Sequence, residues 1–206
     1  MARQISCPSC GAPLQIESAY TTLLVCNFCG ASLYVRDTGV DLTGKTAKLA
    51  DFPSRLSVGA SGKVKGRAFK ILGRVRYQNE DGFFDEWFLQ LDNQQVGWMT
   101  EDEGDLTLIF KTKLTSPIPP FDQIKVGTFI PLGTDRMFVS EKGNAKIMGA
   151  QGEVSMTTSP GRPVQYVDGN AANKFIRLLI GESGITLHTG EPLEFKDVVV
   201  DASVSQ

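Results

Sequence analysis

Short apolar runs separated by glycine-containing or acidic turns make up most of the chain. Apolar and polar residues alternate along residues 84–91, which is the period of a strand buried on one face. Comparable runs lie on either side of it, at residues 69–72, 74–77, 96–99 and 106–110. Consecutive strands joined by short turns form an antiparallel meander. The pattern therefore predicts a mainly β domain over residues 55–200.

The second half of this domain echoes the first. A proline-rich segment, residues 116–120, interrupts the meander. On each side of it, a valine–glycine pair and a further glycine precede an apolar run. Before it these are Val58, Gly59, Gly66 and residues 69–72, and after it Val126, Gly127, Gly133 and residues 137–139. This echo predicts two related β-units packed as one antiparallel barrel or sandwich.

Residues 170–179 are compatible with two kinds of element. Asn170 could cap a helix that runs through the apolar residues after it. The glycine-containing turn at 181–184 and the run at 185–188 fit a hairpin equally well. We favour a strand.

All four cysteines lie in the first 29 residues with the spacing C-x2-C-x15-C-x2-C, at Cys7, Cys10, Cys26 and Cys29. Two residues between cysteines let one tight turn aim both sulfurs at a single point, and the glycine after each pair permits a positive φ. Four thiolates make the closed tetrahedral shell of a structural zinc. Alternating runs at 12–16, 22–25 and 31–35 supply short strands. We therefore predict a zinc ribbon over residues 1–36.

Two other uses of these cysteines are disfavoured. Disulfides suit an oxidising compartment, and the first residues contain no hydrophobic segment typical of export. A redox C-x-x-C would leave the second, identical turn unexplained. Because a closed four-thiolate shell has no open position for a substrate, catalysis by the metal is disfavoured as well.

Residues 39–46, GVDLTGKT, match the phosphate-loop pattern G-x-x-x-x-G-K-[ST]. A phosphate loop requires a buried strand before it and a helix after it. The candidate strand at 33–36 already belongs to the predicted ribbon, and Pro53 interrupts any helix that could follow. We interpret the match as accidental, regard nucleotide hydrolysis as disfavoured, and predict a linker over residues 37–54.

Composition narrows the classes of partner. The net charge of −2 and the pI near 5.5 give the 206-residue chain no overall attraction to nucleic acid or anionic lipid. No apolar run approaches the roughly 20 residues of a membrane-spanning helix. Together with the absence of an export segment, this predicts a cytoplasmic protein.

Charge is segregated along the meander. Residues 54–77 contain seven bases and no acid, whereas residues 78–105 contain nine acids and no base. The bases are Arg55, Lys63, Lys65, Arg67, Lys70, Arg74 and Arg76. One interpretation is a basic stripe for the phosphates of nucleic acid or lipid. We favour the other, in which neighbouring strands place opposite charges side by side.

Two tryptophans, the histidine and an adjacent pair of acids are further candidates for binding or catalysis. Trp87 and Trp98 could stack on bases, but their alternating strands favour a place in the core or lining a groove. His188 is the single histidine and lies beside an apolar residue, as packed strand residues do. Asp85 and Glu86 are adjacent in a strand, so they point to opposite faces and cannot pair as acid and base. The sequence therefore gives no support for an enzyme.

A family resemblance rests on residues 74–77, 85–89 and 97–104, which read RVRY, DEWFL and GWMTEDEG. With the glycine-rich approach through Gly59 and Gly66 and the later stretch 141–152, they resemble the bacterial domain-of-unknown-function family 4178 over roughly residues 54–195. Phe84 stands where the family usually has tryptophan, which keeps an aromatic ring at that position.

The resemblance implies a bacterial, cytosolic, β-rich domain without established catalytic residues, often preceded by a zinc ribbon. Genes of the family accompany small membrane proteins, which implies a link to membrane stress. We therefore hypothesise a non-catalytic binding or adaptor protein with protein partners, membrane-associated ones included. The alternative is a nucleic-acid-binding protein that uses the ribbon and a surface of Lys63, Lys65, Arg67, Arg74, Arg76, Trp87 and Trp98.

Overall fold

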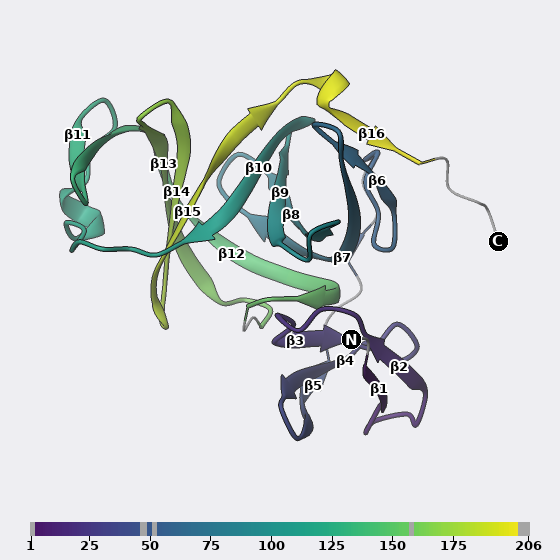
Figure 1. Ribbon diagram of the computed structural model, residues 1–206. Helices are drawn as coiled ribbons and strands as arrows, with labels where there is room; N and C mark the ends of the chain where they lie inside the picture. The colour runs from purple at the N-terminus through teal and green to yellow at the C-terminus, as the bar shows by residue number, and fades with distance from the viewer. Residues whose placement is uncertain (1–2, 46–48, 51–52, 157–158, 202–206) are drawn as a thin grey trace.

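The protein is mainly β, as the sequence predicts (Figure 1). The computed structural model describes residues 3–45, 49–50, 53–156 and 159–201. Five strands form the N-terminal ribbon: β1 (Arg3–Ser6), β2 (Pro13–Ile16), β3 (Leu23–Val25), β4 (Ala31–Arg36) and β5 (Gly39–Lys45). Within the described residues, β1 and β2 pair as a separate two-stranded sheet, and the remaining strands belong to one 14-stranded sheet.

The β-domain contains two successive sets of five strands, which we call the first and the second repeat. The first repeat contains β6 (Ser61–Val64), β7 (Arg67–Gln78), β8 (Phe83–Leu91), β9 (Val96–Asp102) and β10 (Asp105–Thr112). After the short 3-10 helix η1 (Phe121–Gln123), the second repeat contains β11 (Phe129–Leu132), β12 (Asp135–Val154), β13 (Pro163–Ala171), β14 (Lys174–Gly181) and β15 (Gly184–Leu193). The chain ends with η2 (Phe195–Asp197) and β16 (Val198–Val200), which pairs with β6.

The two repeats are built alike, which confirms the two related β-units. The Gly59 N–H donates to the Ile71 carbonyl oxygen over 2.9 Å, and the Gly127 N–H donates to the Val139 carbonyl oxygen over 2.9 Å. Immediately after Ile71 in β7 and after Val139 in β12, the pairing register shifts, as at a β-bulge. Both glycines have a positive φ, which explains why the sequence repeats glycine there.

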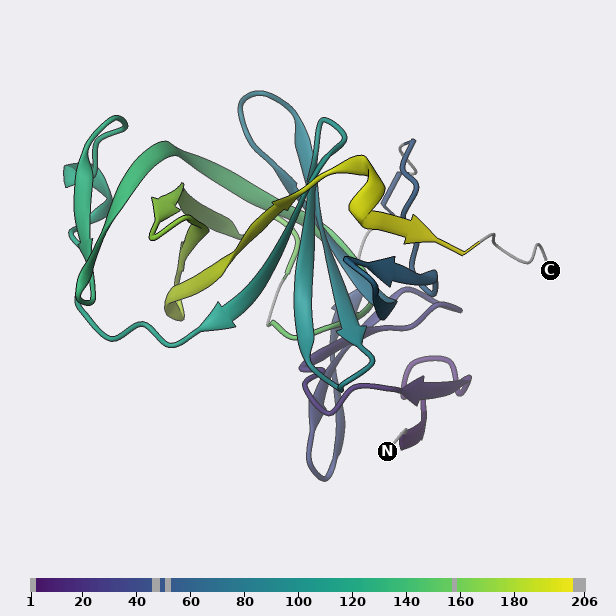
Figure 2. The same ribbon diagram turned by 45° about the horizontal axis from the view of Figure 1, so that its top comes forward.

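The repeats close into a ring of eight strands. The order is β7-β8-β9-β10-β15-β14-β13-β12, and β12 pairs back with β7. β10 pairs with β15 at one seam, and β7 with β12 at the other. Figures 1 and 2 show the first repeat curling on one side of the molecule and the second on the other. Eight strands enclose a space that side chains or one small ligand can fill.

Alternate residues of each strand serve different cores. Trp87 and Leu89 point into the core of the first repeat, and Val167 points into that of the second. The residue between the first two, Phe88, points the opposite way into a central core shared by both repeats. This alternation is the period of two that the sequence displayed along residues 84–91.

Two boundary questions from the sequence are settled by the strands. The strand interpretation is confirmed for residues 174–179, which lie in β14, whereas residues 170–171 end β13 and residues 172–173 form the turn between the two strands. The linker prediction is wrong at its start, because β5 pairs along β4 and extends the ribbon to residue 45. The segment that spells the phosphate-loop pattern is thus mostly a strand instead of a loop, and its last residue, Thr46, lies outside the described residues.

The ribbon is joined to the β-domain by backbone pairing and by a buried carboxylate. Glu153 and Val154 at the end of β12 pair with β3. The buried Glu153 side chain accepts hydrogen bonds from the Glu17 N–H over 2.8 Å, the Ser18 N–H over 3.2 Å and the Thr21 hydroxyl over 2.5 Å. Three donors around one buried carboxylate fix the ribbon to the domain instead of leaving it tethered.

Replacing Glu153 with alanine is expected to loosen this junction. Two backbone N–H groups and the Thr21 hydroxyl lose their acceptor, which costs about 1–3 kcal/mol for each group left buried and unpaired. Hydrogen exchange should quicken at β3 and at residues 17–21 of the Glu153→Ala variant. The exposed Glu80→Ala is the matched control, and unchanged protection in β3 of Glu153→Ala would contradict the assignment.

Candidate functional site

The two cysteine turns of the ribbon have the same backbone geometry. In the first, the Cys7 N–H donates to the Ala12 carbonyl and the Gly11 N–H donates to the Cys7 carbonyl, each over 2.8 Å. In the second turn, Cys26, Gly30 and Ala31 repeat these bonds over 2.8 and 2.9 Å. The glycines have φ of 76° and 72°, as the position after each cysteine pair requires.

The four sulfurs are arranged to hold one metal ion. All four Sγ atoms lie within 4.8 Å of one another, with 3.8 Å between Cys7 and Cys29 and 3.9 Å between Cys10 and Cys26. A tetrahedron with Zn–S bonds of about 2.3 Å has sulfur–sulfur edges of about 3.8 Å, so zinc fits this set. A disulfide would require about 2.05 Å. The sulfurs are therefore placed as ligands.

The surroundings of the sulfurs shift their pKa values in different directions. Burial raises the pKa of the Cys26 thiol. The Ala31 N–H hydrogen-bonds to the Cys29 sulfur and lowers the pKa of that thiol to about 6. The apolar core of the ribbon is small. Its largest buried side chains are those of Leu14, Ile16, Leu24 and Leu33. A core of this size supplies little of the free energy of folding, so binding of a metal ion would be coupled to folding of the ribbon.

The basic stripe is not one exposed surface. Lys63 and Lys65 are exposed and Arg67 is partly exposed, but Arg74 and Arg76 are buried. The Arg76 guanidinium donates to both carboxylate oxygens of Asp85, over 2.8 and 2.6 Å, and Arg74 lies 3.3 Å from the same carboxylate. Arg74 and Arg76 therefore cannot belong to an exposed nucleic-acid-binding surface, which corrects that hypothesis. For these two arginines, the expectation of opposite charges on neighbouring strands is confirmed.

The tryptophans do not contribute to such a surface either. Trp87 packs in the core of the first repeat, and its indole N–H donates to Glu101 over 2.9 Å. Trp98 packs against Phe88 in the central core, with ring centroids 5.0 Å apart. Both are at most 5% exposed, so neither can stack on a nucleic-acid base. The core interpretation of Trp87 and Trp98 is confirmed.

A charged network lies buried between the repeats. Arg177 of β14 donates to Asp168 over 2.9 and 2.5 Å and to Glu86 over 3.1 Å. The Tyr77 hydroxyl donates to the other oxygen of Glu86 over 3.1 Å. Burial raises the pKa of Glu86, and the charge of Arg177 opposes that rise. Glu86 and Asp85 have separate partners on opposite faces of β8, as their adjacent positions predict.

The fold does not require this network. In the first repeat, Phe88, Trp98 and Ile109 stand in register across β8, β9 and β10 and form an apolar row. The matching row across β13, β14 and β15 of the second repeat is Asp168, Arg177 and His188, and all three are buried. The two repeats thus differ in chemistry at the same place, with an apolar row in the first and a charged row in the second.

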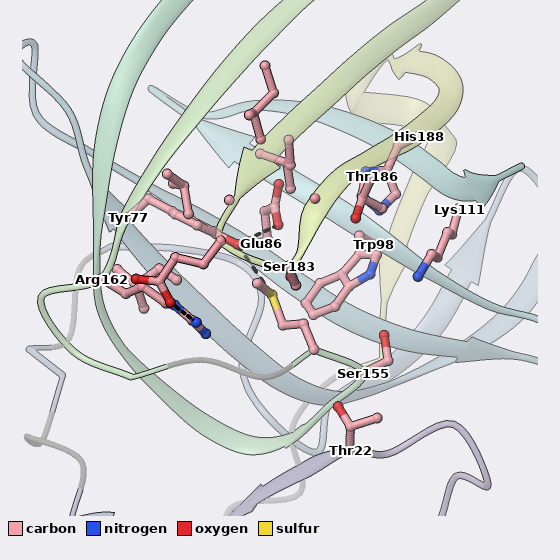
Figure 3. A pocket seen from close by; sticks show the side chains of 18 residues that line it. Thr22, Tyr77, Glu86, Trp98, Lys111, Ser155, Arg162, Ser183, Thr186 and His188 are labelled. Carbon is pink, nitrogen blue, oxygen red and sulfur yellow. Dashed lines mark hydrogen bonds and ion pairs between the residues drawn. The ribbon is translucent and has the colours of Figure 1, made fainter. Parts of the chain in front are cut away.

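A pocket opens at the end of this charged row (Figure 3). It encloses about 240 Å³ and is lined by residues of both repeats and by Thr22 of the ribbon. Trp98, Lys111 and His188 lie together on one side of it, and the buried Glu86 lines the wall between Trp98 and Tyr77. His188 is packed as its position beside Leu187 predicts, but its side chain also borders open space.

The β-domain is similar to a known protein family. Residues 57–195 match a domain of unknown function, DUF4178. The chain belongs to the DUF4178 family. Neither the curated proteins nor the solved structures give a match. The DUF4178 segment runs from just before β6 to the start of η2, so it contains both repeats, the charged network and nearly all of the pocket.

The four-cysteine ribbon lies outside the DUF4178 segment, and it contributes Thr22 to the pocket. In the described residues, the structure contains no helix of the length and hydrophobicity needed to cross a membrane. No motif or spacing in the sequence singles out Asp168, Arg177 or Lys111. Aligning the two repeats of DUF4178 would have found the first two, because charged residues replace apolar ones at matching positions.

Proposed function

We propose that the protein is a non-catalytic binding protein, an adaptor in which a zinc ribbon is held in a fixed position on the DUF4178 domain. The observation that carries the proposal is the junction, where β3 pairs with β12 and Glu153 binds three ribbon groups. A ribbon built only to cap the domain would have no need of exposed apolar side chains, and this one has three.

These three side chains are Tyr20, Phe28 and Leu42, which are 59%, 65% and 53% exposed. Phe28 lies inside the second cysteine turn, between two proposed zinc ligands, so the metal would fix its backbone. Exposed aromatic residues on a rigid support are typical anchors of protein–protein interfaces. The proposed partner is a protein of the bacterial cytoplasm, and the family's genetic neighbours favour one attached to the membrane.

Affinity capture with cross-linking in the native host tests this role. We expect at least one protein to be captured specifically by the wild type and lost with Phe28→Ser. Phe195→Ser is the matched control, because Phe195 is exposed on the DUF4178 domain, away from the ribbon. Capture of nucleic acid with no specific protein, or equal capture by Phe28→Ser, would overturn the adaptor role.

A further inference from the structure

One buried polar atom of the pocket has no partner, and an exposed ammonium group stands on the neighbouring strand. The His188 side chain is 5% exposed, and its Nδ1 atom has no hydrogen-bond partner within the part of the chain that the structure describes. Lys111 stands directly opposite His188 in the β10–β15 pair and lines the same pocket. Among the described residues its ammonium group makes no ion pair. A buried nitrogen without a partner costs free energy, which suggests that a ligand satisfies it.

The other charged groups that line the pocket are already engaged. Both oxygens of Glu86 are used, one by Arg177 and one by Tyr77. Arg162 at the rim is paired with Glu182. Among the described residues, Lys111 is thus the one charged side chain of the pocket lining that has no charged partner. A negative group on a ligand could pair with it.

The walls of the pocket beside these groups are apolar. Trp98 lies next to Lys111 and His188 (Figure 3). Leu179, Met156 and Ile147 also line the pocket. A ligand for such a pocket has a charged head and a small apolar body. Pockets of this kind occur at the mouths of β-barrels.

We propose that this pocket binds a small organic carboxylate, with its carboxylate group between Lys111 and His188 and its apolar body against Trp98. This goes beyond the adaptor role and does not depend on it. The charged row of the second repeat then has a purpose, because it places His188 and a positive guanidinium where the first repeat has apolar side chains.

The electrostatics of His188 agree with an anionic ligand. Burial, together with the charges of Arg177 and Lys111, lowers the pKa of His188 to about 4, so the ring is neutral near pH 7. Glu86, a buried residue of the pocket wall, is held by Arg177 and Tyr77. A bound carboxylate would accept a hydrogen bond from the imidazole and raise the pKa of His188.

Octanoate is the probe for the first test, and the readout is the proton NMR signal of His188. Because His188 is the single histidine of the sequence, an untagged protein gives one assignable imidazole. We expect octanoate to shift this signal saturably in the wild type. In Lys111→Met the apparent Kd should rise about tenfold, which is the loss of one charge-assisted contact.

Lys113→Met is the matched control, since Lys113 is exposed, lies two residues further along and does not line the pocket. It should bind octanoate as the wild type does. The proposal is overturned if octanoate gives no saturable shift, if octanol or octylammonium binds as tightly, or if Lys111→Met leaves the Kd unchanged. Lys111 is exposed at the surface, so its replacement should leave the unfolding midpoint unaltered.

Discussion

Serine at both Cys26 and Cys29 is expected to abolish tight zinc binding and to unfold the ribbon. Two of four thiolate ligands are lost, and the small core around Leu33 cannot hold residues 3–45 together without the metal. Structural zinc sites contribute about 10–16 kcal/mol of apparent binding free energy, so the effect should be all-or-none at ordinary metal concentrations. Native mass spectrometry should show one zinc per wild-type chain and none in the variant.

Ser9→Ala provides the control for this experiment. Ser9 lies in the first cysteine turn and is exposed, but its side chain offers no ligand to the site. This variant should keep its zinc and its ribbon signals in an NMR spectrum. A wild-type protein that remains metal-free in zinc-supplemented buffer, yet has a folded ribbon, would disprove the metal assignment.

Replacing Arg177 with methionine is expected to destabilise the β-domain strongly. The substitution keeps an unbranched side chain but leaves Asp168 and Glu86 buried without their cation. Removing one partner of a buried ion pair costs about 3–5 kcal/mol, which is much of the stability of an ordinary domain. Urea unfolding of the zinc-loaded protein should show the midpoint fall accordingly.

The comparison for this variant is Arg67→Met. Arg67 lies on β7, and its partners Asn93, Gln95 and Asp92 are at the surface. Exposed contacts of this kind contribute little, so its unfolding midpoint should stay close to that of the wild type. If Arg177→Met unfolds at the same urea concentration as Arg67→Met, the buried network is not stabilised by charge pairing as described.

The local patterns of the sequence were sufficient for the elements but not for the closure of the fold. Alternation along residues 84–91 and the repeated glycines at Gly59 and Gly127 identified strands and two related units. These signals depend on neighbouring residues, and they carry through to β8 and to the paired bulges. The seam between β7 and β12 joins segments that are far apart in the chain, so no local pattern could show it.

The same limit explains the errors in the candidate surface. Spacing places Arg74 and Arg76 on one face of a strand, but it does not reveal whether that face is covered. Both lie on a buried face, opposite an acid that cancels their charge. The cysteines were read correctly as a cluster because their ligand geometry is almost entirely local. β5 was missed because glycine, aspartate and threonine make its sequence read as a turn.

The seams of the ring also bear on aggregation. A closed ring presents no unpaired strand edge, and an unpaired edge is where a second chain can add by backbone hydrogen bonding. The end of β12 extends past its pairing with β7, and there β3 of the ribbon covers Glu153 and Val154. If the ribbon unfolds, this edge loses its cover. A metal ion that stabilises the ribbon would thereby also protect a strand edge from self-association.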